Sequence, residues 1–287
     1  MPLQGGHPAR RRIASRTTAM LIATWNVNSI KQRLDALTAW LKEREPDVVC
    51  LQETKCVDAA FPREEIEALG YNVALHGQKT FNGVAVLSKL RFDEVTPRLP
   101  GDAEDDHARF LEVVVSAGPR AVRIASLYLP NGNPPGRADA PSDKYRYKLA
   151  WMDRLVRYAS ERLRLEEPLV LAGDYNVIPA PADVSNPAVW TGDALFLPQT
   201  RLRFGALLHL GFTEAVRATT DAGRVYTFWD YQAGAWQKNA GIRIDHLLLS
   251  SQAADRLVAA GVDKHVRGWE RPSDHVPAWI ELQMQDG

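Results

Sequence analysis

The chain has 287 residues, of which 45% are apolar, and it carries 35 basic and 35 acidic side chains. This composition indicates a globular protein with a sizeable core, and no apolar run approaches the roughly 18 residues of a membrane helix. Residues 1–19 hold four arginines and no acid, which leaves the body with 31 basic and 35 acidic residues. Bulk electrostatics in such a body do not favour nucleic acid, so a polyanion site would need a local basic patch.

Residues 1–19 are rich in Gly, Pro, Arg and Ser and lack the apolar segment of a secretory signal. We expect a disordered basic extension, followed by a single catalytic domain over residues 20–287. Two origins of the extension stay open. It is either a basic arm or weak targeting segment, or the product of a start assigned too early, with Met20 as the natural first residue.

Apolar, β-branched runs recur along the chain and are typical of strands. They lie at residues 21–25, 48–52, 84–88, 111–115, 122–129, 169–172, 244–249 and 277–282. Apolar residues at helical spacing predict helices over 31–44 and 143–165, and shorter helices over 63–69, 201–210 and 251–259. This mixture favours an α/β fold in which two sheets pack face to face with helices outside.

The two cysteines, Cys50 and Cys56, are too few for a disulfide framework. We therefore expect a reducing compartment, the cytoplasm, and Cys50 is expected to be a small buried side chain within its apolar run. Without a CxxC pair or an HExxH motif, the sequence does not indicate a thiolate or histidine zinc site.

Polar residues follow the first two apolar runs. Glu53 comes after residues 48–52, and a carboxylate at the end of a buried strand can point into a cleft and bind Mg²⁺. Asn26 and Asn28 follow the first run and could bind metal or phosphate. Taken alone, these residues are as well explained by a surface glutamate and by caps of the next helix.

Asp174 and Asn176, in the sequence Gly-Asp-Tyr-Asn, follow the apolar run 169–172. Two such side chains at a strand end can face one cavity, where Asp174 orients or deprotonates a water and Asn176 holds the water or a phosphate. An Asx turn is the structural alternative. The fully apolar strand before them favours the functional interpretation.

The last third of the chain adds Asp245 and the pair Asp274 and His275. A histidine held by a buried aspartate keeps one tautomer and can stay protonated against a phosphate, so we favour an active-site role for His275. His246 should face away from its neighbour Asp245 on a strand and is expected to be structural.

Aromatic residues crowd positions 226–231, and basic and amide residues follow them. Such surroundings suit a nucleic-acid surface or a sugar pocket, although some of these rings must belong to the core. Tyr128 ends another strand just before Pro130. Its phenol could donate to a phosphate oxygen or only pack on the proline.

Taken in this order, the residues resemble the exonuclease III family of apurinic/apyrimidinic (AP) endonucleases, within the endonuclease/exonuclease/phosphatase superfamily. The supporting local sequences are residues 51–55, 70–72, 81–85, 226–231, 241–245 and 272–275. The resemblance covers nearly all of residues 20–285. It implies a four-layer α/β sandwich, with two packed mixed β-sheets flanked by helices and a cleft at the strand ends.

The resemblance implies a Mg²⁺-dependent DNA repair nuclease, with Mn²⁺ as a substitute ion. It would incise duplex DNA 5′ to abasic sites, repair blocked 3′ ends and act as a 3′→5′ exonuclease. The implied metal residues are Glu53, Asn26, Asn28 and Asp274, and the implied catalytic residues are Tyr128, Asp174, Asn176, Asp245 and His275. The implied DNA contacts are Asn131, Phe228, Trp229, Lys238, Asn239 and Ile242. We expect a monomer whose partner is double-stranded DNA with abasic sites or 3′ ends, associated with the nucleoid and not with a membrane.

A flipped-out sugar without its base would fit a small apolar pocket, which by position Phe228, Ile242 and Ile244 should line. Many relatives have a larger aromatic residue near Ile242, so this pocket is expected to be roomier. Asn131 is expected to enter the DNA groove, and the loop 132–142 to tune exonuclease against endonuclease activity.

Three alternatives share much of this pattern. The enzyme could be mainly a 3′→5′ exonuclease or a nonspecific deoxyribonuclease. It could be a phosphoesterase of the same superfamily acting outside DNA, although such enzymes are not expected to keep residues 228–231 and 241–245. A DNA-binding module without catalysis is the third, and it conflicts with the presence of all the acidic residues and His275.

Overall fold

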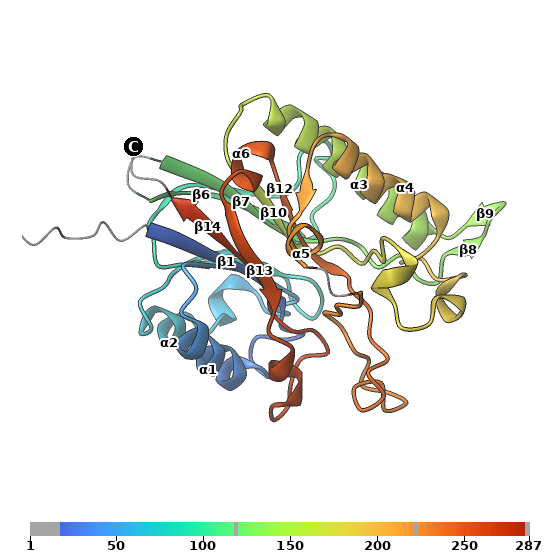
Figure 1. Cartoon of the computed structure of the whole chain (residues 1–287), viewed down its shortest axis with the longest axis horizontal. Helices are drawn as coiled ribbons and strands as arrows, with labels where there is room; N and C mark the ends of the chain where they lie inside the picture. Colours follow the sequence, from blue (N-terminus) through green and yellow to red (C-terminus); the bar gives the residue numbers. More distant parts are fainter. Residues whose placement is uncertain (1–17, 118–119, 221–222, 285–287) are drawn as a thin grey trace, which may run out of the picture.

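The structure is a computed structural model that describes residues 18–117, 120–220 and 223–284. Two six-stranded sheets pack face to face, and helices cover their outer faces (Figure 1). This architecture confirms the predicted four-layer α/β sandwich with two mixed sheets. Residues 1–17 lie outside the described residues, so the expected disordered extension stays a prediction.

The first sheet runs in the order β13-β14-β1-β2-β4-β3, with β1 and β2 parallel. Its strands are β1 (Thr18–Asn26), β2 (Val48–Gln52), β3 (Asn72–His76), β4 (Val84–Ser88), β13 (Leu257–Val262) and β14 (Ala278–Met284). Helices α1 (Leu34–Arg44) and α2 (Arg63–Glu67) cover its outer face, where Trp40 and Ile66 are fully buried. Because β1 and β2 run parallel, their carboxyl ends meet at one edge of the sheet.

The second sheet runs in the order β11-β12-β10-β7-β6-β5, with β7 and β10 parallel. Its strands are β5 (Phe92–Pro97), β6 (Phe110–Ala117), β7 (Arg120–Tyr128), β10 (Leu169–Asp174), β11 (Thr213–Glu214) and β12 (Asp245–Leu249). Helices α3 (Asp143–Leu163) and α4 (Pro198–His209) cover its outer face. No helix in the described part of the chain is long and apolar enough to cross a membrane.

Short elements complete the chain. They are the hairpin of β8 (Gly136–Arg137) and β9 (Ala140–Pro141), helices α5 (Ala215–Thr219) and α6 (Ser251–Ala254), and the 3₁₀ turns Asp58–Ala60, Pro181–Asp183, Pro187–Trp190 and Lys264–Gly268. The hairpin projects from the body of the molecule beside α3 and α4 (Figure 1). It lies within the loop 132–142 that the sequence singled out.

The inner faces of the two sheets share one apolar cluster, to which Ile22 and Val86 contribute from the first sheet and Ile124 and Leu247 from the second. Strands β2, β10 and β12 are buried at every position. They therefore appear in the sequence as continuous apolar runs, whereas β14 alternates buried and half-buried residues.

Two sequence-based expectations need correction. Strand β1 begins at Thr18 and pairs Thr18 with Met284 and Ala19 with Gln283, so these two residues belong to the sheet and not to the extension. The predicted helix over 251–259 is wrong beyond α6. Residues from Leu257 onward form β13, because pairing with β14 overrides the helical preference of Ala259 and Ala260.

A small polar cluster links the two sheets directly behind the strand ends. Gln52 Nε2 donates to Thr24 Oγ1 in the same sheet (3.0 Å) and to Ser126 Oγ of β7 in the other sheet (3.1 Å). All three side chains are fully buried. Glu53, which follows β2, and Tyr128, which ends β7, are therefore anchored next to this cluster.

We predict that Gln52→Ala lowers the free energy of unfolding by about 2–4 kcal/mol, because it opens a cavity and leaves two buried hydroxyls without their partner. Chemical denaturation measures this change. Gln237→Ala, on an exposed loop, is the matched control and should change stability by less than about 0.5 kcal/mol. Equal effects of the two changes would contradict the proposed role of the cluster.

Candidate active site

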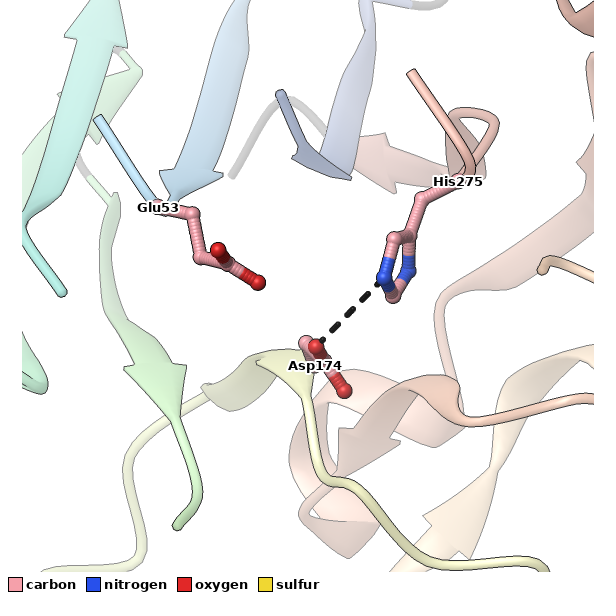
Figure 2. A group of neighbouring side chains, drawn as sticks. All are labelled: Glu53, Asp174 and His275. Carbon is pink, nitrogen blue, oxygen red and sulfur yellow. Dashed lines mark ion pairs between the residues drawn. The ribbon is translucent and has the colours of Figure 1, made fainter. Parts of the chain in front are cut away.

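Chain segments from both sheets bring functional side chains to one point. Asn26 and Glu53 lie at the ends of β1 and β2, and Asp174 at the end of β10. Asp245 begins β12 directly opposite Asp174 in the antiparallel pair, and His275 precedes β14. Glu53, Asp174 and His275 point toward one another (Figure 2), and their ligand atoms all lie within 4.8 Å of each other.

Asn26 is fully buried between the two carboxylates. Its amide nitrogen donates to Glu53 Oε1 (2.8 Å) and to Asp174 Oδ2 (2.9 Å). Its amide oxygen accepts from the backbone N–H of Asn28 (3.0 Å). In this structure Asn26 therefore orients the carboxylates, and its expected role as a metal ligand stays a prediction that these bonds do not support.

Glu53 is held by a lysine that the sequence analysis did not single out. Lys55 Nζ lies 2.8 Å from Glu53 Oε2 and also donates to Asn28 Oδ1. Burial alone would raise the pKa of Glu53, but Lys55 and the Asn26 amide outweigh burial and hold the pKa below its usual range. Glu53 is therefore an ionised oxygen donor, which suits a hard cation such as Mg²⁺.

Tyr128 and Glu53 line the same cavity, and the Glu53 carboxylate acts on the phenol electrostatically. Burial raises the pKa of the Tyr128 phenol well above its usual value, and the neighbouring carboxylates add to this effect. The Arg109 guanidinium lies over the Tyr128 ring, with its Cζ atom 4.8 Å from the ring centroid. Tyr128 thus stays a neutral hydrogen-bond donor at this position.

His275 is held by Asp245, as the sequence analysis expected. Its Nδ1 lies 2.9 Å from Asp245 Oδ2, and its Nε2 lies 3.7 Å from Asp174 Oδ2. Burial alone would lower the pKa of His275, but Asp245 and Asp174 outweigh burial and raise it to about 10. In this protonated form both ring nitrogens are donors, and Nε2 faces the space between Glu53 and Asp174.

Asp174 is fully buried, and burial raises its pKa above the usual range, although His275 acts in the opposite direction. Its Oδ1 accepts from the backbone N–H of Asn176 (2.9 Å). The Asn176 amide accepts from Asn131 Nδ2 (2.9 Å) and donates to the Leu129 carbonyl (2.9 Å). Asp174, Asn176 and Asn131 therefore form one hydrogen-bonded set that extends from the bottom of the site to its rim.

Several loops at this edge have an unusual backbone. Asn28, Glu53, Lys55 and Asn176 all have positive φ angles, between 44° and 53°. Such angles cost energy for residues other than glycine and often occur at functional sites. The same feature makes these turns hard to predict from apolar periodicity.

The groups surround a cavity of about 290 Å³. Its lining residues are Glu53, Tyr128, Asn131, Asn133, Asp174, Asn176, Trp190, Asp193, Leu195, Phe228, Asp230, Ile242, Ile244, Asp274 and His275. Phe228, Ile242 and Ile244 form its apolar wall, as expected. Leu195 belongs to the same apolar cluster and was missed, because the loop 178–200 carries no pattern that separates lining residues from others.

Trp229 is not a DNA contact, and this expectation is wrong. The side chain is fully buried against Tyr226 and Val276, and its Nε1 donates to Asn239 Oδ1 (3.2 Å). Neighbouring residues in extended chain face opposite ways, so Phe228 faces the site and Trp229 the core. Lys238 and Asn239 are exposed but do not line the cavity, and their DNA contacts stay predictions.

Asp274 lines the cavity but lies outside the group formed by Glu53, Asp174 and His275. Its Oδ1 accepts from Asn28 Nδ2 (3.1 Å). Asn28 and Asp274 thus form a pair at one side of the site, and their binding of a metal stays a prediction. Ser273, also missed, donates to the Asn26 carbonyl (2.7 Å) and fixes the turn before His275.

His246 lies in a buried charged cluster away from the cavity and is structural in its contacts, as expected. Its Nδ1 lies 2.9 Å from Arg243 Nη1, and its Nε2 lies 3.1 Å from the Val177 carbonyl. Arg243 in turn pairs with Asp183 and Glu214 at 2.9 Å. This cluster holds the loop around Asp183 against the segment before β12 that carries Ile242 and Ile244.

Known proteins resemble this chain along most of its length. The model of the endonuclease/exonuclease/phosphatase family matches residues 23–275. Exodeoxyribonuclease III of Haemophilus influenzae is 32% identical, over 92% of this chain and 100% of that protein. The structure of an AP endonuclease from Archaeoglobus fulgidus matches with a TM-score of 0.85 and 34% identity, over 92% of this chain and 100% of that chain. The 3′ phosphatase NExo from Neisseria, bound to a product DNA hairpin, matches over the same shares with a TM-score of 0.87 and 35% identity.

We predict that His275 of the metal-free protein stays protonated through neutral pH and titrates with a pKa near 10, which NMR of the imidazole measures. Asp245→Asn should lower this pKa, because it removes the carboxylate that stabilises the imidazolium. Asp230→Asn, which removes another carboxylate of the same cavity, should leave the titration unchanged. A pKa near the ordinary value of 6.5 in the unaltered protein would contradict the assigned charge state.

Proposed function

Because the chain belongs to the exonuclease III family of AP endonucleases, within the endonuclease/exonuclease/phosphatase family, we propose that it is a Mg²⁺-dependent DNA repair nuclease. Its proposed reactions are incision of duplex DNA 5′ to abasic sites, removal of blocked 3′ ends and 3′→5′ exonuclease activity. The chain from Thr18 onward would form the catalytic domain. The observation that carries the proposal is the convergence of Glu53, Asp174 and His275 on one point.

The donor set fits a divalent cation. Glu53 and Asp174 offer carboxylate oxygens in close proximity, which hard cations such as Mg²⁺ and Mn²⁺ prefer. Glu53 is the proposed ligand, because its carboxylate is ionised and partly accessible. When bound, such an ion offsets negative charge on the phosphoryl and leaving oxygens.

The chain's own residues supply the other parts of the reaction. Asp174 would orient and deprotonate the attacking water, and its raised pKa brings it closer to neutral pH, where a general base is effective. The His275 imidazolium would donate from Nε2 to a phosphate oxygen, where negative charge grows in the transition state. Tyr128 and the amides of Asn131 and Asn176 would add neutral hydrogen bonds around the same phosphate.

A basic groove beside the site supports DNA as the substrate. A second cavity of about 480 Å³ shares Glu53, Tyr128 and Asn131 with the first, and Arg109 and Lys144 line it. Phe81, also in this lining, is 69% exposed and offers a face for stacking. The groove is the local basic patch that a body with excess acidic residues requires for binding a polyanion.

The apolar wall gives a reason to rank 3′-end processing as the second candidate for the main activity. Leu195 is buried against Phe228, Ile242 and Ile244 on the side where a flipped abasic sugar would enter. The pocket was expected to be roomier because Ile242 stands where many relatives have a larger aromatic residue. The Leu195 side chain fills part of that space. A 3′-phosphate needs no sugar pocket, and a similar protein is a 3′ phosphatase.

The proposal is tested with three duplexes, which carry an abasic-site analogue, a 3′-phosphate and a recessed undamaged 3′ end. Each is incubated with Mg²⁺ and with EDTA. Mg²⁺-dependent incision 5′ to the lesion supports the AP endonuclease, and cleavage at the 3′ ends alone supports the second candidate. Cleavage of none of the three would reject a DNA repair nuclease.

We predict that Asp174→Ala lowers turnover by at least about 10²–10⁴-fold, because the attacking water loses its base. DNA affinity, measured by fluorescence anisotropy, should change little, since Asp174 lies below the binding surface. Asp153→Ala, in an exposed ion pair between α3 and Arg203 of α4 that does not line the cavity, is the matched control and should keep full activity. Comparable turnover of Asp174→Ala and the control would reject the assigned role.

We predict that Leu195→Gly raises incision at the abasic analogue relative to 3′-phosphate removal, by about 10-fold or more, because a flipped sugar gains room. The ratio of the two rates in one preparation is the measured quantity, so that partial unfolding cancels. Leu202→Gly, at an exposed position of α4, is the control for an added glycine. An unchanged ratio would show that Leu195 does not limit the pocket.

A further inference from the structure

Lys148 of α3 is a buried cation that the proposed chemistry does not use. Its side chain is fully buried, and among the described residues no other lysine is buried. It lies four residues before Met152 and so faces the apolar side of the helix. An ammonium group in such a position must be compensated by hydrogen bonds or charges nearby.

The ammonium group bonds to the main chain of the active-site loops. Lys148 Nζ donates to the carbonyl of Asn131 (3.0 Å) and to the carbonyl of Asn176 (2.6 Å). These carbonyls belong to the loops after β7 and β10, which are parallel neighbours in the second sheet. Because Asn131 Nδ2 also donates to Asn176 Oδ1 (2.9 Å), the three residues close a ring of hydrogen bonds.

Burial lowers the pKa of Lys148 to about 7, while Asp174 and Asp193 act in the opposite direction. Neither carboxylate forms a hydrogen bond with Nζ in the described part of the chain. The two carbonyls are therefore its direct partners. Among the described residues, Lys148 Nζ thus binds the main chain of the two loops and does not form an ion pair with a carboxylate.

The loop after β7 also fits closely over the aliphatic part of Lys148. Gly132 has a φ angle of +85°, and a Cβ atom there would lie 2.7 Å from Lys148 Cδ and 3.3 Å from Lys148 Cβ. A side chain at position 132 would thus push the loop off the lysine. The path of the loop and the position of Lys148 depend on each other.

We propose that Lys148 is a positioning residue of the active site, which fixes the main chains of Asn131 and Asn176 so that their amides hold one arrangement at the phosphate. Lys148 does not contact DNA, because Gly132 and the two carbonyls cover it. It acts through the two asparagines. This inference rests on the proposed function of the site, but its structural part is tested without activity.

The first test is amide hydrogen exchange, measured by NMR in the full chain. Lys148→Met keeps the length of the side chain and removes the ammonium, so the amides of Asn133 and Asn176 should exchange about 10- to 100-fold faster. Arg154→Met is the matched control, because Arg154 is another buried cation of α3, and its partners Asp102 and Asp105 do not line the active-site cavity. It should leave exchange of both amides unchanged.

The second test is kinetic and uses whichever duplex the unaltered protein cleaves. Lys148→Met should lower kcat by about 10- to 100-fold while KM for DNA stays within about twofold, and Arg154→Met should keep kcat. In an Asn131→Ala background the further loss from Lys148→Met should be several-fold smaller, because one of the two positioned amides is already absent. If Lys148→Met does not fold, Gly132→Ala displaces the same loop and should give the same two signatures.

Unchanged exchange at Asn133 and Asn176 would overturn the proposal, and so would faster exchange with full kcat. An equal loss of kcat in Arg154→Met would also overturn it, since the effect would then reflect general destabilisation. If the unaltered protein cleaves none of the three duplexes, the proposed function fails. The exchange measurement still decides whether Lys148 fixes the loops.

Discussion

The site depends on one buried amide, Asn26, which holds two carboxylates that come from opposite sheets. Asn26 and Glu53 end neighbouring strands of the first sheet, and Asp174 ends a strand of the second. Two carboxylates this close repel each other unless each has donors of its own. The Asn26 amide supplies one hydrogen bond to each of them. The packing of the two sheets therefore sets the distance between the proposed metal ligand and the proposed base.

The surroundings of this pair separate its two roles. Lys55 keeps Glu53 ionised, whereas burial raises the pKa of Asp174, so one carboxylate is suited to a cation and the other to a proton. His275 carries positive charge because Asp245 lies behind it. Lys148 fixes the loops of Asn131 and Asn176 at the rim of the site by donating to their carbonyls. Lys55 and His275 thus place positive charge beside the carboxylates of Glu53, Asp174 and Asp245, and this positive charge favours the binding of a phosphate anion.

The buried strands and the strand-end acids could be predicted from the sequence, because β2, β10 and β12 are covered on both faces and appear as apolar runs. In the two six-stranded sheets, the strands that were missed all lie at sheet edges, where exposed and half-exposed residues leave no such run; they are β3, β5, β11 and β13. The short hairpin strands β8 and β9 were missed as well. Contacts between residues that are distant in the sequence could not be predicted from it either. Lys148 gave one usable signal, a lysine at helical spacing with Met152, but its two carbonyl partners lie on distant loops. The burial of Trp229 follows from the alternation with Phe228 and could have been expected.

The proposed function requires a divalent cation at Glu53, with His275 facing the phosphate from the other side. Anomalous diffraction from crystals grown with Mn²⁺ and a product duplex tests it most directly. We predict a manganese peak on the Glu53 carboxylate and a phosphate oxygen within hydrogen-bond distance of His275 Nε2. A peak at Asn28 and Asp274 with none at Glu53, or a His275 ring bound to the metal, would contradict it.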